Sequence, residues 1–199
     1  VLLVMFYFSP AKMDFKLPLP ESLFAAAGFL VLPLPMALAA LFSALGDWCG
    51  SATFENFYLQ IAFFAVAHLC MIWFFLSLGL KHKKKGARRS ATYTAMTFAV
   101  AIALIYSVSN IIVPDVNNVV TSRFVLMYGC IITIMAWSAL MQRDWLYGAA
   151  ALLFVVSDWI IAYSRFVEHV PHAGLIIMST YYVAQLLFFL RSAREREKN

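Results

Sequence analysis

The sequence predicts an all-α protein, a polytopic bundle of transmembrane helices. Of its 199 residues, 63% are hydrophobic and only 13% are charged, which is unusual for a soluble globular chain. The charges are also unevenly spread, so that they bound a series of almost uncharged runs. Each run has about 18–25 residues, the length that crosses roughly 30 Å of hydrocarbon at about 1.5 Å per residue.

The N-terminal part predicts helices before residue 47. Val1–Phe8 is apolar but short and lacks the charged flank and cleavage site of a signal peptide, so we expect it to be the end of a first helix. Leu17–Gly46 covers about 45 Å if it is straight, which is long for one crossing. Pro33 and Pro35 each remove a backbone donor within it. We therefore expect two short spans there and about eight helices in total; one kinked span would leave seven.

The remaining runs predict five further spans in one membrane domain, residues 1–190, followed by a short basic tail, residues 191–199. Their order predicts helices that cross in alternate directions. The five expected spans are Asn56–Leu80, Ser90–Val113, Val119–Met141, Trp145–Ser164 and Ala173–Leu190.

The basic residues predict the orientation in the membrane. Six of the fifteen Lys and Arg lie in "KHKKKGARR", Lys81–Arg89, and four lie in the tail "RSAREREKN". Basic residues collect in cytoplasmic loops, so both segments are expected inside. We prefer this interpretation to headgroup binding or nucleic-acid binding, and expect membrane lipids but no nucleic acid as partners.

Two charges interrupt the span that contains "SDWIIAYSRF". Asp158 is expected in the outer half of the hydrocarbon and Arg165 near the outer surface. Seven residues is almost two helical turns, so both side chains leave one face. They can form a structural ion pair that ties helices together. Intramembrane charges more often mark function, and we favour a functional site.

Other polar residues are expected at similar depth in other spans. Each has a structural alternative: an interhelical hydrogen bond, a helix cap, or ordinary packing. They are Asp47 at the outer mouth, His68 in the Asn56–Leu80 span, and Tyr181, Tyr182 and Gln185 in the last span. The sequence thus predicts a polar site in the outer half of the membrane, if these faces converge.

Metal sites and disulfides are not expected. Cys49, Cys70 and Cys130 are far apart, and two of them lie in apolar runs, so we interpret them as small hydrophobic residues. The histidines form no HxxxH pair or three-ligand cluster. No cofactor is expected either.

Four segments, in this order and spacing, carry a family resemblance. They are "LFSALGDW", "FFAVAHL", "GAAALLFVVSDWIIAYSRF" and "STYYVAQLLFFL". From about Leu41 to Leu190, and most strongly from Gly148, the chain resembles the lysoplasmalogenase family of multi-span membrane proteins, also called YhhN-like. The SDxxIAxxRF element followed by YYxAQ is the most specific part of this resemblance.

The resemblance implies a membrane hydrolase of lysoplasmalogens, lysophospholipids whose remaining chain is held by a vinyl ether. Products would be a fatty aldehyde and a glycerophosphoethanolamine or glycerophosphocholine. It assigns motif positions to Asp47, His68, Asp158, Arg165, Tyr181, Tyr182 and Gln185.

Vinyl-ether hydrolysis needs an acid that protonates the alkene carbon and an anion that stabilises the oxocarbenium ion. Asp158 and Asp47 are the candidates, in either assignment, because pairing with Arg165 would make Asp158 the anion. His68 could orient water or donate to the leaving oxygen, and Arg165 could alternatively hold the lipid phosphate. No GxSxG element is present, which argues against a serine lipase.

Two other functions use the same residues differently. A lipid-binding protein or proton-coupled transporter would use the Asp158–Arg165 pair as its site. A structural membrane subunit would use the polar residues to join helices, and replacing Asp158 would then affect folding first.

Overall fold

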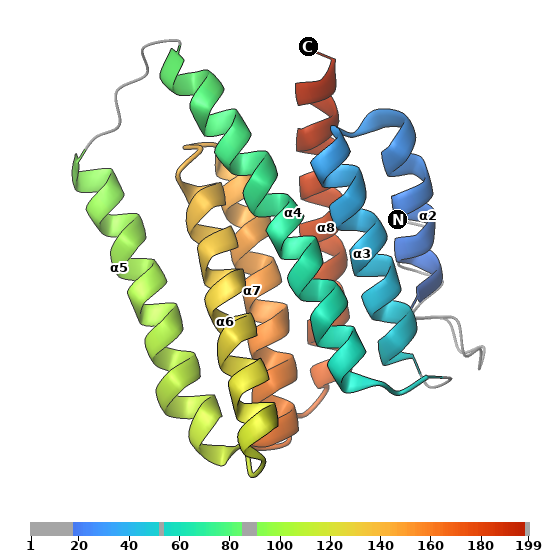
Figure 1. Cartoon of the computed structure of the whole chain (residues 1–199), viewed down its shortest axis with the longest axis vertical. Coiled ribbons are helices and arrows are strands. Elements are labelled where there is room, and N and C mark those ends of the chain that lie inside the picture. The colour runs from blue at the N-terminus through green and yellow to red at the C-terminus, as the bar shows by residue number, and fades with distance from the viewer. Residues whose placement is uncertain (1–17, 52–53, 85–90, 198–199) are drawn as a thin grey trace. The chain divides into compact units, whose positions relative to one another are not determined.

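The structure is a computed structural model that describes residues 18–51, 54–84 and 91–197. The described part consists of helices and connections and contains no strand. Figure 1 labels the helices of the described part. They are α2 (Pro18–Val31), α3 (Leu34–Gly50), α4 (Phe57–Lys84), α5 (Ala91–Ser107), α6 (Val119–Leu140), α7 (Trp145–Phe166) and α8 (Ala173–Arg196).

Five segments are long and apolar enough to cross a membrane, by length and composition. They are Phe57–Lys81, Ala91–Asp115, Val119–Leu140, Trp145–Phe166 and Ala173–Arg196. Each overlaps one of the five spans expected from the sequence. The predicted all-α transmembrane bundle is therefore confirmed, and the chain is an integral multi-pass membrane protein.

The segment around the "PLP" element forms two helices. α2 ends at Val31 and α3 starts at Leu34. Pro33 has extended backbone torsions, φ −56° and ψ 143°, and its carbonyl accepts hydrogen bonds from Met36 N at 2.9 Å and Ala37 N at 3.0 Å. Proline thus ends one helix and starts the next, as the sequence predicts. The first helix expected over Val1–Phe8 lies outside the described residues.

The chain divides into two compact units. Unit 1 is Val1–Phe74 with Phe189–Asn199, and unit 2 is Phe75–Phe188. The long helices α4 and α8 each contribute one part to either unit. We describe the two units separately.

In unit 1, α2 and α3 form a tight antiparallel hairpin. Its open end is joined by the Trp48 indole, which donates a hydrogen bond to Ser22 Oγ at 3.1 Å. At the turn, Arg196 of α8 donates from Nη1 to Phe29 O in the last turn of α2 at 3.2 Å and to Leu32 O just after α2 at 2.9 Å. Last-turn carbonyls have no partner within their own helix, so this guanidinium caps α2.

In unit 2, the helices cross in alternate directions (Figure 1). α6 and α7 begin at side-chain caps: Asn118 Oδ1 accepts from Val120 N at 2.8 Å, and Asp144 Oδ1 accepts from Leu146 N at 3.0 Å. Such caps satisfy backbone donors that a helix start leaves unpaired. The connections before α6 and α7 therefore contain the residues that start the next helix.

The end of α5 departs from regular α-helix. A π-helical turn over Val108–Ile112 and a 3₁₀ turn over Val113–Asp115 follow it. Pro114 lacks the N–H that would donate to the carbonyl of Asn110. The Asn110 side chain donates from Nδ2 to Tyr106 O at 3.0 Å. Such single π turns are often found at functional sites.

Two helices run further than the expected spans. α4 continues to Lys84 and α8 to Arg196, so the start of the expected Lys81–Arg89 loop and most of the expected tail are helical. Lysine, arginine and glutamate are good helix formers, and basic residues suit a helix C-terminus. Residues 85–89 lie outside the described part of the chain.

Candidate functional site

The side chain of Asp158 is held by a tyrosine from the neighbouring helix of unit 2. Tyr128 of α6 donates its hydroxyl hydrogen bond to Asp158 Oδ2 on α7. Ser157 Oγ lies 3.4 Å from the other oxygen, Oδ1. Both carboxylate oxygens thus have a polar neighbour, and the carboxyl group is oriented by the Tyr128 hydroxyl.

A cavity adjoins this hydrogen bond. Its volume is about 40 Å³, and its walls come from α5, the π turn, α6 and α7. Most of the lining is apolar, including Leu104, Ile132 and Val155, and the polar lining side chains are Tyr128, Asp158 and Thr133. An oriented carboxyl group beside a small apolar cavity is the arrangement expected of a reactive or binding site.

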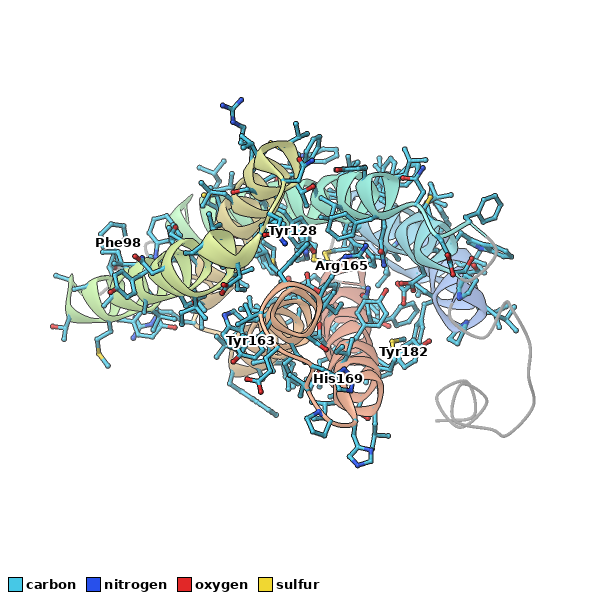
Figure 2. The ribbon with its side chains drawn as sticks, turned by 90° about the horizontal axis from the view of Figure 1, so that it is seen from below. Phe98, Tyr128, Tyr163, Arg165, His169 and Tyr182 are labelled. Atoms are coloured by element: carbon cyan, nitrogen blue, oxygen red, sulfur yellow. The ribbon has the colours of Figure 1, made fainter. Side chains whose placement is uncertain are left out.

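α6 and the π turn approach each other closely at Gly129, which lines the cavity. A Cβ atom on Gly129 would lie 2.9 Å from Cγ1 of Val108, the first residue of the π turn. Gly129 is the residue after Tyr128, so the π turn and the tyrosine meet at the same level of α6. Figure 2 places Tyr128 in the interior, whereas Phe98 lies on the outer face of α5.

Of the predicted residues of the last helix, Tyr181 lies against α7. Tyr181 packs edge-on against Phe154, with ring centroids 5.3 Å apart, and Phe154 is one turn before Asp158. Gln185 Nε2 donates to Tyr181 Oη at 3.4 Å, and the ring of Tyr182 lies 5.4 Å from that of Tyr181. All three side chains are buried. The structure therefore places Tyr181 against α7, with Tyr182 and Gln185 beside it on α8.

Arg165 lies in the last turn of α7 and is exposed. Its guanidinium carbon is 5.9 Å from the ring centroid of Phe166. His169 and His172 are exposed in the turn that follows. Pairing of Arg165 with Asp158 stays a prediction.

Asp47 and His68 belong to unit 1 and are both buried. Their helices approach closely at Gly46, where a Cβ atom would lie 2.8 Å from the Phe64 ring. Asp47 follows Gly46, and His68 is one turn after Phe64. The packing of α3 on α4 therefore brings these two predicted residues to neighbouring turns within unit 1.

Glu21 was not expected in the site. It lies in the first turn of α2, is fully buried, and interacts electrostatically with Asp47. Neither of its carboxyl oxygens has a hydrogen-bond partner among the described residues. An available signal was the position of an acid just after two prolines and before an apolar run.

Tyr128 was also not expected, although its position carried a signal. Tyrosines of transmembrane helices usually lie at the membrane interfaces, whereas Tyr128 is near the middle of Val119–Leu140. A mid-span tyrosine implies a partner for its hydroxyl, but only the fold identifies that partner.

Five of the seven predicted site residues, Asp158, Arg165, Tyr181, Tyr182 and Gln185, lie in unit 2, and Asp47 and His68 lie in unit 1. The pairing of Asp47 with Asp158 therefore stays a prediction. Within the residues that the structure describes, no three His, Cys, Asp or Glu side chains are grouped so that they could hold a metal ion.

Comparison with known proteins extends over most of the chain. The sequence model of the YhhN family matches residues 3–192. Lysoplasmalogenase TMEM86B of Rattus norvegicus is 35% identical over 153 residues, 76% of this chain and 58% of the rat protein. TMEM86B of Homo sapiens is 33% identical over 78% of this chain and 62% of its own length. Lysoplasmalogenase TMEM86A of Homo sapiens is 29% identical over 96% of this chain and 88% of its own length.

The chain thus spans about three fifths of the length of the TMEM86B proteins. No solved structure matches it significantly. A family match that covers almost every described helix, together with the helical membrane architecture, means that this chain belongs to the YhhN family.

Proposed function

We propose that this chain is a membrane hydrolase that cleaves the vinyl-ether bond of lysoplasmalogens. The substrate would be a 1-alkenyl lysophospholipid of the membrane, and the products a fatty aldehyde and a glycerophosphoethanolamine or glycerophosphocholine. The observation that carries the proposal is the Asp158 carboxyl group, oriented by Tyr128 beside an apolar cavity within helices that span the membrane. The names of the TMEM86A and TMEM86B relatives support the substrate class.

The chemistry of the bond suits carboxyl groups. Protonation of the alkene carbon gives an oxocarbenium ion, water adds to it, and the hemiacetal collapses to aldehyde and alcohol. A carboxylate stabilises such a cation and accepts a proton from water, as in glycosidases. We propose Asp158 and Asp47 as the acid that protonates the alkene and the carboxylate that stabilises the cation, in either assignment.

The other predicted residues have proposed roles in binding and proton transfer. His68 would orient water or donate to the leaving oxygen. Arg165, exposed at the end of α7, suits a lipid phosphate, because guanidinium binds phosphate with two parallel hydrogen bonds. Tyr181, Tyr182 and Gln185 would shape the wall beside α7.

The proposed orientation follows the basic residues. The Lys81–Arg89 segment and the C-terminal residues after Leu190 would face the cytoplasm. Asp115 and Glu168 lie in the connections at the opposite end of unit 2 (Figure 1), which would face outward. The site would then lie in the outer half of the bilayer.

The proposal is tested by aldehyde release from a 1-alkenyl lysophosphoethanolamine by the purified protein in detergent. The saturated-ether analogue is the substrate control. Aldehyde should form from the alkenyl lipid alone, and Asp158→Asn should lower kcat by about 10²–10⁴-fold, the range for loss of an acid or base.

Asp115→Asn is the matched variant, because Asp115 is an exposed carboxylate of the same unit. It should leave the rate unchanged. Absence of aldehyde with well-folded wild-type protein would reject the substrate, and retained binding of the lipid would then favour a lipid-binding protein.

A further inference from the structure

Glu21 is a buried acidic side chain to which the proposed hydrolysis gives no role. It lies in the first turn of α2 and is fully buried, and neither of its carboxyl oxygens has a hydrogen-bond partner among the described residues. An unsatisfied polar group in an apolar interior costs free energy. A group that is retained at this cost indicates a function rather than a contribution to stability.

The packing of α2 on α3 shows which residues face each other in the hairpin. Near the turn, a Cβ atom on Gly28 would be 3.8 Å from Cα of Ala37. Towards the open end, Ala25 packs in one cluster with Ala40 and Ala44. Residues three or four apart share a helix face, so these small residues form one continuous contact, which we call the alanine seam.

Glu21 and Asp47 extend the alanine seam towards the open end of the hairpin. Glu21 is one turn before the α2 alanine of the seam, and Asp47 is one turn after its last α3 alanine. The residues that follow them, Ser22 and Trp48, are joined by the hydrogen bond from the Trp48 indole at 3.1 Å. The register of the hairpin therefore brings the two acidic residues to the same level, where they interact electrostatically.

The surroundings of Glu21 favour its neutral, protonated form. A carboxylate that accepts no hydrogen bond is strongly destabilised in an apolar interior. Asp47 is a second acidic group beside it, and two neighbouring carboxylates repel each other when both are ionised. Glu21 therefore carries a hydroxyl group that has no acceptor among the described residues.

The proposed reaction would create an acceptor for this hydroxyl. When Asp47 passes its proton to the alkene carbon, it becomes a carboxylate with about four lone-pair positions, so it can accept a donor in addition to its existing contacts. A hydrogen bond to an ionised acceptor is roughly twice as strong as one between neutral groups. The Glu21 hydroxyl would thus stabilise Asp47 most after the proton transfer, which lowers the barrier of that step.

We propose that Glu21 is a positioning residue for Asp47, and that Asp47 is the acid of the hydrolysis. This inference rests on the proposed function. The alkene π electrons form a C–H bond with the Asp47 proton, and the carbon beside the ether oxygen becomes part of the oxocarbenium ion. Asp47 is left as an anion that accepts the Glu21 hydrogen bond. Water adds to the cation, and the proton that the adduct releases returns to Asp47, so the hemiacetal forms and both acids are restored.

The kinetic test compares two substitutions of Glu21, with the 1-alkenyl lysophosphoethanolamine as substrate. Glu21→Leu removes the hydroxyl, so kcat for aldehyde release should fall about 10–100-fold, with KM within about twofold because Glu21 does not touch the lipid. Glu21→Gln keeps a hydrogen-bond donor, and its kcat should stay within about fivefold of the wild type. Glu21→Leu should also unfold at a higher temperature than the wild type, so its lower activity cannot be a loss of folding.

Ser192→Ala is the matched control in unit 1. The Ser192 hydroxyl is also fully buried without a hydrogen-bond partner among the described residues. It lies one turn before Arg196, which contacts the turn of the hairpin, whereas Glu21 lies towards the open end. Ser192→Ala removes the same kind of unsatisfied group and should leave kcat unchanged. Equal kcat values for Glu21→Leu and Ser192→Ala would overturn the role of Glu21, and an equal loss in Glu21→Leu and Glu21→Gln would overturn the hydrogen bond.

Infrared spectroscopy tests the protonated form of Glu21 without catalysis. The difference spectrum between the wild type and Glu21→Leu at neutral pH should contain the carbonyl band of a protonated carboxylic acid. Absence of this band overturns the proposal, whether or not aldehyde forms. The band without aldehyde from the wild-type protein overturns the proposed hydrolysis, and the role of Glu21 in it, while the neutral acid in the hairpin stands.

Discussion

Two acidic side chains of this chain differ in what surrounds them. Asp158 accepts a hydrogen bond from Tyr128 and faces a cavity, whereas Glu21 is fully buried in α2. A charged carboxylate is costly in an apolar interior, and an unpaired neutral one still loses its hydrogen bonds to water. Glu21 therefore lowers the stability of the hairpin in which it lies.

Replacing Glu21 by leucine should consequently stabilise the protein. The expected gain is about 1–2 kcal/mol in the free energy of unfolding, the cost of an unsatisfied buried polar group. Thermal unfolding in detergent measures it. The control is Glu197→Leu, at a residue that is exposed after α8 and should change stability little. A loss of stability in Glu21→Leu would mean that the carboxyl group is bound by a partner.

Residue-level prediction from the sequence was limited by distance along the chain. Asp158 could be selected because a charge in an apolar run is conspicuous. Tyr128 could not be linked to it, because the two are 30 positions apart and a tyrosine fits an apolar run. Glu21 was not selected, because it lies near the start of the Leu17–Gly46 segment and sequence alone does not show that its side chain is buried.

At the scale of helices, small residues determine how closely α3 approaches α4. Gly46 and Gly50 form a GxxxG spacing, and a Cβ atom at either position would overlap a side chain of α4. Helices in membranes pack through such small residues, since apolar side chains gain little by leaving lipid. This contact holds Asp47 at its place in unit 1.

Substitution Gly46→Ala should therefore destabilise the protein. The new methyl group would meet the rigid Phe64 ring at 2.8 Å, and overpacking of this kind costs about 1–3 kcal/mol. Gly174→Ala is the matched control, because no atom lies within 4 Å of its Cβ position. Alanine there should leave stability equal or slightly higher. Equal unfolding midpoints for the two variants would argue against close packing at Gly46.

The helices themselves were largely predictable, because the thickness of the hydrocarbon layer sets the length of each uncharged segment and charged residues mark its ends. The five long spans and the break between α2 and α3 follow from apolar length and proline. The helical extensions to Lys84 and Arg196 were not predicted. We ended each expected span at its first charged residues, but lysine, arginine and glutamate are good helix formers, so the helix continues through them. The π turn over Val108–Ile112 was not predicted, because hydrophobic periodicity does not distinguish a π turn from an α-helix.

For the whole molecule, the distribution of basic residues makes the orientation testable. A single cysteine at Glu168, in the α7–α8 turn, should react with a membrane-impermeant maleimide on intact cells. A cysteine at Glu197 should react only after permeabilisation. The parent protein needs Cys49, Cys70 and Cys130 replaced by alanine, because all three are partly exposed. The opposite labelling pattern would invert the proposed topology and place the site in the inner leaflet.

The cap that Arg196 provides for α2 has a consequence for biosynthesis. The Phe29 and Leu32 carbonyls receive their donor from a residue 167 and 164 positions later. While the ribosome is still producing the intervening helices, these carbonyls must be satisfied by water, lipid headgroups or the insertion machinery. Unit 1 can close only after α8 has been synthesised, so the earliest and latest helices of the described chain complete their folding together.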